Sequence, residues 1–488
     1  YRWMNYQQFV RSKQMRASNR TRLYSQYRQE QVQEKLSQLG IFSYMDMQYA
    51  PRDTTAACDT LDVTMQATFA KPLDAELELN VVTKSNDQTG PGASFGVTRN
   101  NVFGGGESWN VKLKGSYEWQ TGGGEKSSLM NSWEMGLSTS LTFPRVVFPH
   151  LGKREFDFPA TTTFRLYINQ LNRAKYYKLL SFGGNATYDF QPSRTSRHSI
   201  TPFKLTFNVL QHQSEDFKEI AEANPALYVS LRNQFIPAME YTYTYDNASG
   251  RRIKNPIWWQ STVTSAGNIT SLIYRAFGKP FNEEDKSLLG APFAQFVKLN
   301  TELRHLWNID KNNAIASRMA VGALFTYGNA TIAPYSEQFY VGGANSIRAF
   351  TVRSVGPGGY HPEEGKYSYL DQTGTFRFEA NVEYRFRIFK SFWGATFLDA
   401  GNVWLLRKDR KLLADGKEAR PNSQLRLKTF PRQIALGTGV GIRYDMDILV
   451  FRLDFGIPLH LPYDTERSGY YNVTGAFFKN LGIHFAII

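Results

Sequence analysis

The sequence predicts an all-β transmembrane barrel of about sixteen antiparallel strands, preceded by a small α+β module. Three observations predict this fold class. Apolar and polar residues alternate over long segments from about residue 75 onward. The apolar faces of these segments begin or end in Trp, Tyr or Phe, as the aromatic girdles of a membrane barrel require. Long and short connections also alternate along the chain.

Composition agrees with interleaved apolar residues. The 488 residues are 42% hydrophobic and 15% aromatic, yet mean hydropathy is −0.42. No window holds about 18 consecutive apolar residues, which excludes a helical membrane protein. The single Cys58 excludes a disulfide framework and a Cys-rich metal site. The net charge of +14 is spread over strands, without the gathered basic and aromatic residues of a nucleic-acid site.

Residues 1–72 have a different pattern from the rest. Apolar residues recur at helical spacing between Ser25 and Gly40, and alternation follows at 45–49 and 61–65. These patterns predict a helix and a two-stranded hairpin, a small α+β unit distinct from 73–488. The basic stretch 11–28 is interpreted as a solvated surface, with anionic headgroups as an alternative partner.

The predicted strands of the barrel are numerous and long, often ten residues or more, whereas strands of soluble proteins peak near 5–6. The strands of a soluble β-sandwich also alternate between apolar and polar residues, so strand length and the aromatic ends are what distinguish a membrane barrel from it. The segments are 76–83, 92–99, 107–120, 130–143, 160–170, 180–190, 200–212, 236–247, 257–270, 295–309, 312–328, 373–388, 393–404, 432–445, 447–460 and 478–487.

Connection lengths predict the orientation. With residues 1–72 in the periplasm, short turns such as 310–311 and 389–392 lie on the periplasmic side. The long connections then face outside, as barrels of this kind require. The stretch 144–159 breaks the rule, and we expect it to be an ordered periplasmic excursion. The expected outer connections are 213–235, 271–294, 329–372, 405–431 and 461–477.

Motifs for catalysis are weak. The glycines around Ser94 fit a nucleophile elbow, but strand alternation continues where that motif needs a helix. The glycines of 437–441 lack the helix that follows a phosphate loop, and the seven His residues show no metal-ligand spacing. We therefore expect no enzyme activity, no cofactor and no metal.

The longest connection, 329–372, is too apolar and glycine-rich for a solvated loop, so we expect it to fold into the barrel lumen. Arg348 would then need carboxylates, because an unpaired charge away from water is costly. Glu383 lies on the inward face of 373–388, and Asp399 lies on the next strand; an Arg fork engages two such carboxylates. The alternative is that Arg348 lies in water on an outer loop.

The pattern Gly-Gly-x-x-Ser-Ile-Arg-x-Phe at 342–350, with Phe-x-Asp-x-Gly-x-Val-Trp at 397–404, resembles the BamA/TamA family of outer-membrane assembly factors. Residues 36–49 are similar to the last periplasmic POTRA module of that family, and 100–107 to a strand turn. The sequence around Asp62 is more similar to the TamA-like branch of the family. Ala349 stands where the family usually has Gly, and the end at Ile488 suggests truncation.

The resemblance implies a sixteen-stranded barrel whose inward loop is fixed by an arginine lock, with residues 1–72 as a partial POTRA module in the periplasm. It implies a location in the bacterial outer membrane. The partners would be unfolded outer-membrane proteins, periplasmic or inner-membrane accessory proteins, outer-membrane lipid and lipopolysaccharide. The residues of the arginine lock are Arg348, Glu383, Asp399, Ile347, Phe350, Gly342 and Gly343.

The implied function is insertion of β-barrel proteins into the outer membrane. We expect the first and last strands to close the barrel by a short, weak lateral seam whose opening offers a strand edge to a substrate. The alternative function is a two-partner-type polypeptide secretion pore, which has the same architecture. The residues of the lateral seam are Leu77, Leu79, Val81, Leu481, Ile483 and Phe485.

Overall fold

The structure is a computed structural model of the whole chain. It describes residues 24–37, 39–53, 60–83, 88–120, 132–147, 160–173, 177–215, 218, 233–248, 253–283, 286–288, 290–329, 332–362, 372–407, 420–446, 449–475 and 480–487. Most of the predicted excursion 144–159 and of the outer connection 213–235 lies outside these residues, as do residues 408–419 of the connection 405–431.

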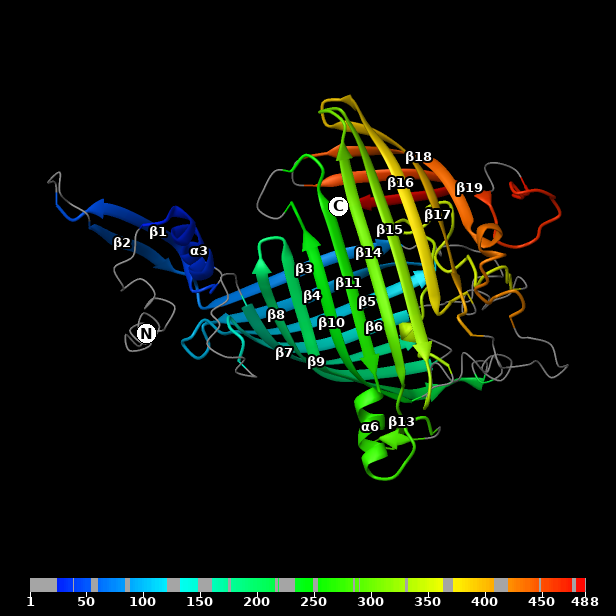
Figure 1. Ribbon diagram of the computed structural model, residues 1–488, viewed down its shortest axis with the longest axis horizontal. Coiled ribbons are helices and arrows are strands. Elements are labelled where there is room, and N and C mark those ends of the chain that lie inside the picture. Colours follow the sequence, from blue (N-terminus) through cyan, green and yellow to red (C-terminus); the bar gives the residue numbers. More distant parts are fainter. Residues whose placement is uncertain are drawn as a thin grey trace.

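The N-terminal part contains one helix and one hairpin, as predicted. Helix α3 (Gln26–Ser37) precedes the antiparallel strands β1 (Phe42–Pro51) and β2 (Leu61–Phe69), which form a sheet of their own. Glu30 of α3 forms an ion pair of 3.6 Å with Arg194, in the turn between β8 (Tyr177–Ser193) and β9 (Ser196–Gln213). The module therefore meets the barrel at an end where strands are joined by short turns (Figure 1). Its assignment as a POTRA module stays a prediction.

Sixteen further strands form one antiparallel sheet in chain order, which confirms the predicted fold class and excludes two stacked sheets, and the short strands β12 (Ser287–Leu288) and β13 (Ala291–Pro292) pair separately. The sheet curves around a lumen (Figure 1). Its strands are β3 (Leu73–Thr83), β4 (Gln88–Asn100), β5 (Ser108–Gln120), β6 (Ser132–Phe143), β7 (Ala160–Arg173), β8 (Tyr177–Ser193), β9 (Ser196–Gln213), β10 (Gln234–Asp246), β11 (Ile257–Ala266), β14 (Phe296–Asn308), β15 (Asn313–Thr326), β16 (Phe376–Phe389), β17 (Phe392–Trp404), β18 (Ala435–Asp445), β19 (Val450–His460) and β20 (Gly482–Ile487).

The two faces of the sheet differ in chemistry because side chains alternate along each strand. Outward residues such as Leu166, Trp259 and Val382 are exposed. Inward residues such as Glu379 and Glu383 are charged and buried. The outer face is thus apolar and aromatic-rich, and the inner face is polar. Among the described residues, no helix is both long and apolar enough to cross a membrane.

Many of the predicted strands differ from the structure by a few residues at an end, and two of these differences alter an element or a predicted site residue. The segment 257–270 ends as a strand at Ala266, because Gly267 adopts a left-handed φ of +69° and helix α6 (Asn268–Ala276) follows. The last strand begins at Gly482 rather than near 478, so Leu481 of the lateral seam precedes it. Residues 476–479 lie outside the described residues.

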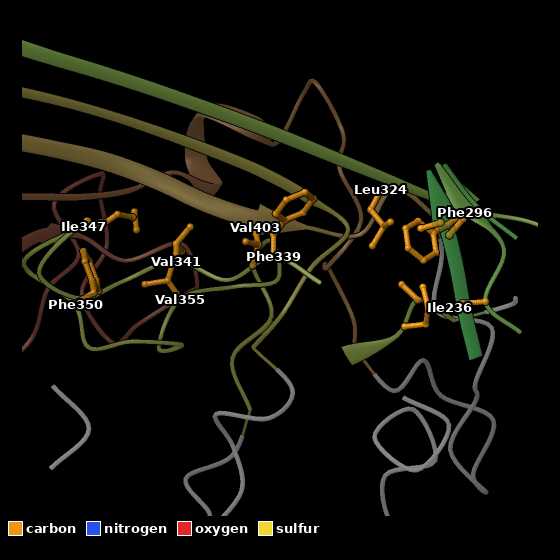
Figure 2. Packing of buried hydrophobic residues seen from close by; sticks show 14 of the residues in the cluster. Ile236, Phe296, Leu324, Phe339, Val341, Ile347, Phe350, Val355 and Val403 are labelled. Atoms are coloured by element: carbon orange, nitrogen blue, oxygen red, sulfur yellow. The ribbon is translucent and has the colours of Figure 1, made fainter. Parts of the chain in front are cut away.

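The described residues of the connection 329–372 pack inside the barrel. The apolar residues among them form one buried cluster with the inner ends of strands β10, β14, β15 and β17 (Figure 2). Val341 and Ile347 are fully buried, and Phe339 packs where a side chain on Gly322 of β15 would collide with its ring. Burial of this apolar surface supplies the general driving force for docking, at about 25 cal/mol per Å².

Candidate functional site: the arginine lock and the two edge strands

The turn that presents Arg348 depends on two glycines. Gly342 and Gly343 have φ values of +102° and +90°, which side-chain-bearing residues rarely adopt. A Cβ on Gly342 would also overlap the main-chain oxygen of Thr351. The turn is closed by hydrogen bonds, from the Gly343 amide to the Phe350 oxygen (2.7 Å) and from the Gly342 amide to Ser346 Oγ (3.0 Å). The backbone conformation thereby directs Arg348 toward the barrel wall.

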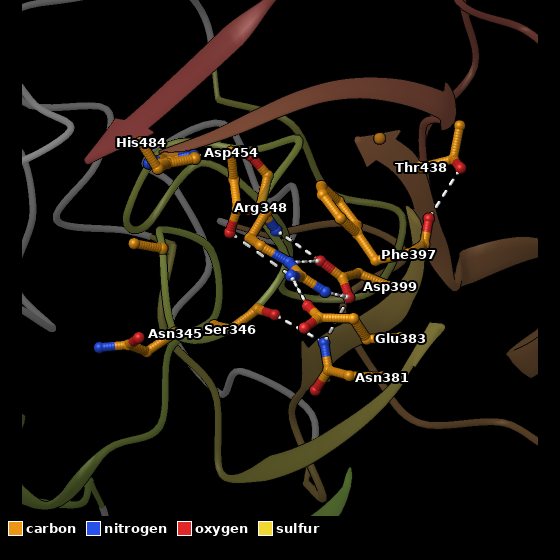
Figure 3. Close-up of polar contacts among 12 residues, drawn as sticks. Asn345, Ser346, Arg348, Asn381, Glu383, Phe397, Asp399, Thr438, Asp454 and His484 are labelled. Carbon is orange, nitrogen blue, oxygen red and sulfur yellow. Dashed lines mark hydrogen bonds and ion pairs between the residues drawn. The ribbon is translucent and has the colours of Figure 1, made fainter. Parts of the chain in front are cut away.

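Arg348 is buried and meets both carboxylates predicted for it (Figure 3). Its Nε and Nη2 donate to the two oxygens of Asp399 on β17, each at 2.8 Å, and its main-chain amide donates to Oδ2 at 3.0 Å. Its Nη1 donates to Glu383 Oε2 on β16. The guanidinium lies 3.5 Å from the ring centroid of Phe397. Bidentate pairing, charge and stacking together fix the side chain in one geometry.

The ion cluster extends beyond the predicted set. Asp454 on β19 lies 3.5 Å from Arg348 Nη1 and accepts from Arg443 Nη1 of β18 at 2.5 Å. Arg443 Nη2 also donates to Glu383, at 3.0 Å, and Arg385 Nε donates to Glu383 Oε1 at 2.7 Å. Three carboxylates and their arginines therefore join the loop to four consecutive strands, β16 to β19.

Sequence reasoning missed Asp454 and Arg443. Both occupy inward positions by the same period-2 phase that identified Glu383, so their inward direction could have been inferred from the sequence. Their contact with Arg348 depends on the stagger of the strands, which alternation does not encode.

The strands facing the loop carry glycines where the loop backbone approaches. A Cβ on Gly456 of β19 would lie 2.7 Å from the oxygen of Arg348, and one on Gly482 of β20 would lie 3.1 Å from it. A Cβ on Gly437 of β18 would overlap the methyl group of Ala349. Ala349 is thus accommodated where the family usually has Gly, because the facing strand has no side chain at that point.

The last strand also contacts the loop. His484 of β20 points inward, and its Nε2 donates to the main-chain oxygen of Arg348 at 2.6 Å (Figure 3). The ladder between β19 and β20 is short, running from the Phe451–Ile487 pair to the Gly456–Gly482 pair. The loop therefore supports a strand that has little pairing of its own.

The predicted lateral seam is not closed in the described part of the chain. The sheet ends in β3 on one side and β20 on the other, with no backbone pairing between them. Its apolar side chains face outward and are largely exposed, at 74% for Leu79 and 64% for Phe485. The other outward residues of the two edges that are exposed in the same way are Leu77, Val81 and Ile483. Leu481, just before β20, is half-buried.

Replacing Arg348 by Ala should loosen the docked loop. The change leaves Asp399 and Glu383 with a lost partner in a buried site, which typically costs about 3–5 kcal/mol. We expect faster cleavage of the loop in limited proteolysis and a lower thermal midpoint in detergent. Arg304→Ala is the control: that side chain is 60% exposed beside Glu302, so the loss should be about 1 kcal/mol or less. Equal protease resistance of the Arg348→Ala variant and the parent would contradict the arginine lock.

Gly437→Ala should weaken docking through steric overlap with Ala349, by about 1–3 kcal/mol. The double variant Gly437→Ala/Ala349→Gly should recover most of the loss, since it moves the methyl group from loop to strand. Thermal midpoints of the parent, the two single variants and the double variant give the coupling energy. Additive losses would show that the two positions do not pack against each other.

Comparison with known proteins identifies the family of the chain. The sequence matches the Omp85 superfamily domain over residues 101–485. BamA from Haemophilus ducreyi, in a form lacking POTRA domains 1–3, has a similar structure, with a TM-score of 0.57 at 13% identity over 94% of this chain and 77% of that chain. CdiB from Acinetobacter baumannii is similar at a TM-score of 0.47 and 12% identity, over 88% of this chain and 64% of that chain. The chain belongs to the Omp85 superfamily and is an outer-membrane β-barrel protein.

Proposed function

We propose that this protein inserts β-barrel proteins into the bacterial outer membrane by offering the edges of β3 and β20 to incoming strands. The observation that carries the proposal is the sheet order, in which these two strands end the sheet without pairing with each other in its described part. A barrel that serves only as a wall or pore gains by closing this gap, because closure satisfies every backbone group.

The physical problem in insertion is the unfinished sheet. A substrate barrel that enters lipid half-built exposes N–H and C=O groups, and each unsatisfied group costs several kcal/mol in hydrocarbon. An existing strand edge satisfies those groups before the substrate strand meets lipid. The chemistry is hydrogen-bond exchange without covalent bonds, so the proposal assigns no catalytic residue and no cofactor.

The two edges differ in stability, which favours β20 as the mobile one. β3 pairs with β4 from Leu73 to Thr83, whereas the β19–β20 ladder is about half as long. β20 also depends on the contact between His484 and the Arg348 oxygen. The arginine lock would therefore act on the edge strand as well as on the loop, and release of one would loosen the other.

The docked loop favours a sideways route over passage through the lumen. Phe339, Val341 and Ile347 fill the space between the strands, and Arg348 ties them to β16 and β17. Export of an unfolded chain through the lumen, as in two-partner secretion, requires the loop to leave and the ion cluster to break. Insertion at the edge leaves the cluster intact.

The same proposal assigns the partners. Unfolded outer-membrane proteins would pair with the edges, and the N-terminal module would receive their strands in the periplasm by adding them beside β1 or β2. Periplasmic or inner-membrane accessory proteins would dock on that module. Outer-membrane lipid would surround the exposed apolar face, and lipopolysaccharide phosphates would meet basic outer residues such as Arg407.

Covalent closure of the lateral seam should stop insertion. In a Cys58→Ser background, Leu79→Cys and Ile483→Cys are joined by a cleavable thiol crosslinker, and insertion of a barrel substrate into liposomes is measured. We expect loss of activity on crosslinking and recovery on cleavage. The control pair Val440→Cys/Phe455→Cys links partners within the β18–β19 ladder, which the proposal leaves intact, and should remain active. Full-rate insertion by the protein crosslinked across the seam would exclude the proposal, and transport of an unfolded polypeptide alone would favour secretion.

Removing the His484 contact should loosen β20 selectively. His484→Ala deletes one buried hydrogen bond worth about 1–1.5 kcal/mol, so amide exchange in β20 should quicken by about tenfold. Exchange in β3 should stay unchanged, and His484→Gln, which retains a donor, should recover part of the protection. A β20 strand protected equally in His484→Ala and the parent would show that the loop does not support the edge.

A further inference from the structure

Helix α6 exposes an apolar face outside the barrel. Ile269, Leu272 and Ile273 are each about half exposed, and Phe277, directly after the helix, is 83% exposed. Their spacing of three and four residues places them on one side of the helix. Contiguous apolar surface on a helix normally marks a contact with a partner or a membrane.

The opposite side of α6 is fastened to the barrel by buried polar contacts. Ser271, fully buried at the centre of the helix, donates to Gln295 Oε1 at 2.9 Å. Asn268 at the helix start accepts from the hydroxyl of Tyr327 at 2.8 Å. Asn329 Oδ1 accepts a hydrogen bond from the main-chain amide of Lys286, and Asn329 Nδ2 donates to the main-chain oxygens of Lys286 and Phe293. The contacts of Ser271 and Asn268 fix which side of the helix faces outward.

Lys286 strengthens the attachment from beneath. The side chain is buried, and its Nζ donates to Ser271 Oγ at 3.1 Å and to the Phe281 oxygen at 2.6 Å. Within the described residues no carboxylate forms an ion pair with it. Burial lowers the pKa of Lys286. The bond to Ser271 joins the helix to this buried segment and helps to fix the orientation of the helix.

Helix α6 directly follows a strand of the lipid-facing wall. The helix starts two residues after the end of β11, whose outward residues Trp259 and Val263 are exposed. In Figure 1, α6 and β13 (Ala291–Pro292) project from the ends of β10, β11 and β14, away from the sheet. Apolar side chains at this level lie where the wall leaves the hydrocarbon.

The basic residues at the end of the helix are suited to a position beside lipid headgroups. Arg275 lies in its last turn, and Lys279 follows, with Nζ 5.7 Å from the ring of Tyr274. Basic residues beside an apolar helix face are typical of helices that lie in a membrane interface, where they meet headgroup phosphates. Acidic groups do not occur in the helix itself.

We propose that α6 is a membrane-interface anchor that lies in the outer leaflet. Ile269, Leu272, Ile273 and Phe277 enter the boundary between headgroups and acyl chains, and the basic end meets lipid phosphates. The occupant of the exposed face is therefore lipid, not a protein partner. The inference rests on the barrel's place in a membrane and does not depend on the insertion function.

Fluorescence quenching in lipid nanodiscs tests the anchor. Single cysteines at Leu272→Cys and Phe277→Cys, in a Cys58→Ser background, carry an environment-sensitive dye in discs of phosphatidylcholine and phosphatidylglycerol. Asn282→Cys, exposed in the loop after the helix, is the matched control. We expect the two helix labels to be quenched by spin-labelled lipid, to be protected from aqueous iodide and to emit at shorter wavelength. The Asn282 label should show the reverse.

Two outcomes overturn the proposal. Iodide quenching of the helix labels as strong as that of the control places the helix in water. Protection from both iodide and spin-labelled lipid means that protein covers the face, as in association of two copies. Lys286→Met is an internal check, because it removes the hydrogen bonds to Ser271 and Phe281. We expect weaker quenching of the Leu272 label by spin-labelled lipid in this variant, since the orientation of the helix sets how deeply the label enters the membrane.

Discussion

The interaction on which the structure depends is the burial of one guanidinium inside the barrel. Arg348 is removed from water by the loop that carries it, so its charge must be compensated by the protein. Asp399, Glu383 and Asp454 supply that compensation from three different strands. Asp399 is itself fully buried and pairs with Arg348, so its charge depends on that arginine in turn. The loop and the barrel wall therefore stabilise each other. If the loop left, the charged residues on four strands would lose Arg348 as a partner and would have to be hydrated instead.

Close approach of the loop has a structural consequence for the strands it faces. The wall can accept the Arg348 backbone only where side chains are absent, at Gly456 and Gly482, and the methyl group of Ala349 only at Gly437. Glycine weakens a strand, because it adds no packing and has more freedom to lose on folding. The last strands are thus poor in cross-strand packing on their inner face, and the loop supplies contacts that their own side chains do not. The arginine lock and the weakness of β20 have a common origin.

Much of this could be predicted from the sequence, for physical reasons that also set the limit. Alternation in a strand assigns each residue to a face, so the strands of the barrel and the inward direction of Glu383 followed from period and phase, whereas Asp399 was placed only on the neighbouring strand. Which inward charges meet depends on strand stagger, and so Asp454, Arg443 and His484 were missed. Helix α6 was missed because Ile269 continues the alternation of β11; only the left-handed Gly267, a three-dimensional feature, ends the strand there. The free edges were also unpredicted, since alternation is the same for open and closed sheets.

On the proposed function, the membrane itself keeps the edge from opening without a substrate. Separation of β20 from β19 toward lipid would expose backbone groups at several kcal/mol each, far more than the contact of His484 contributes. Opening becomes favourable only when another strand takes over those hydrogen bonds, since exchange then leaves no group unsatisfied. The contact between His484 and Arg348 sets how readily the exchange begins, and lipid sets the condition that a strand be present. A barrel with a full lumen and a short last strand can thus act on other barrels without an external energy source at the site of pairing.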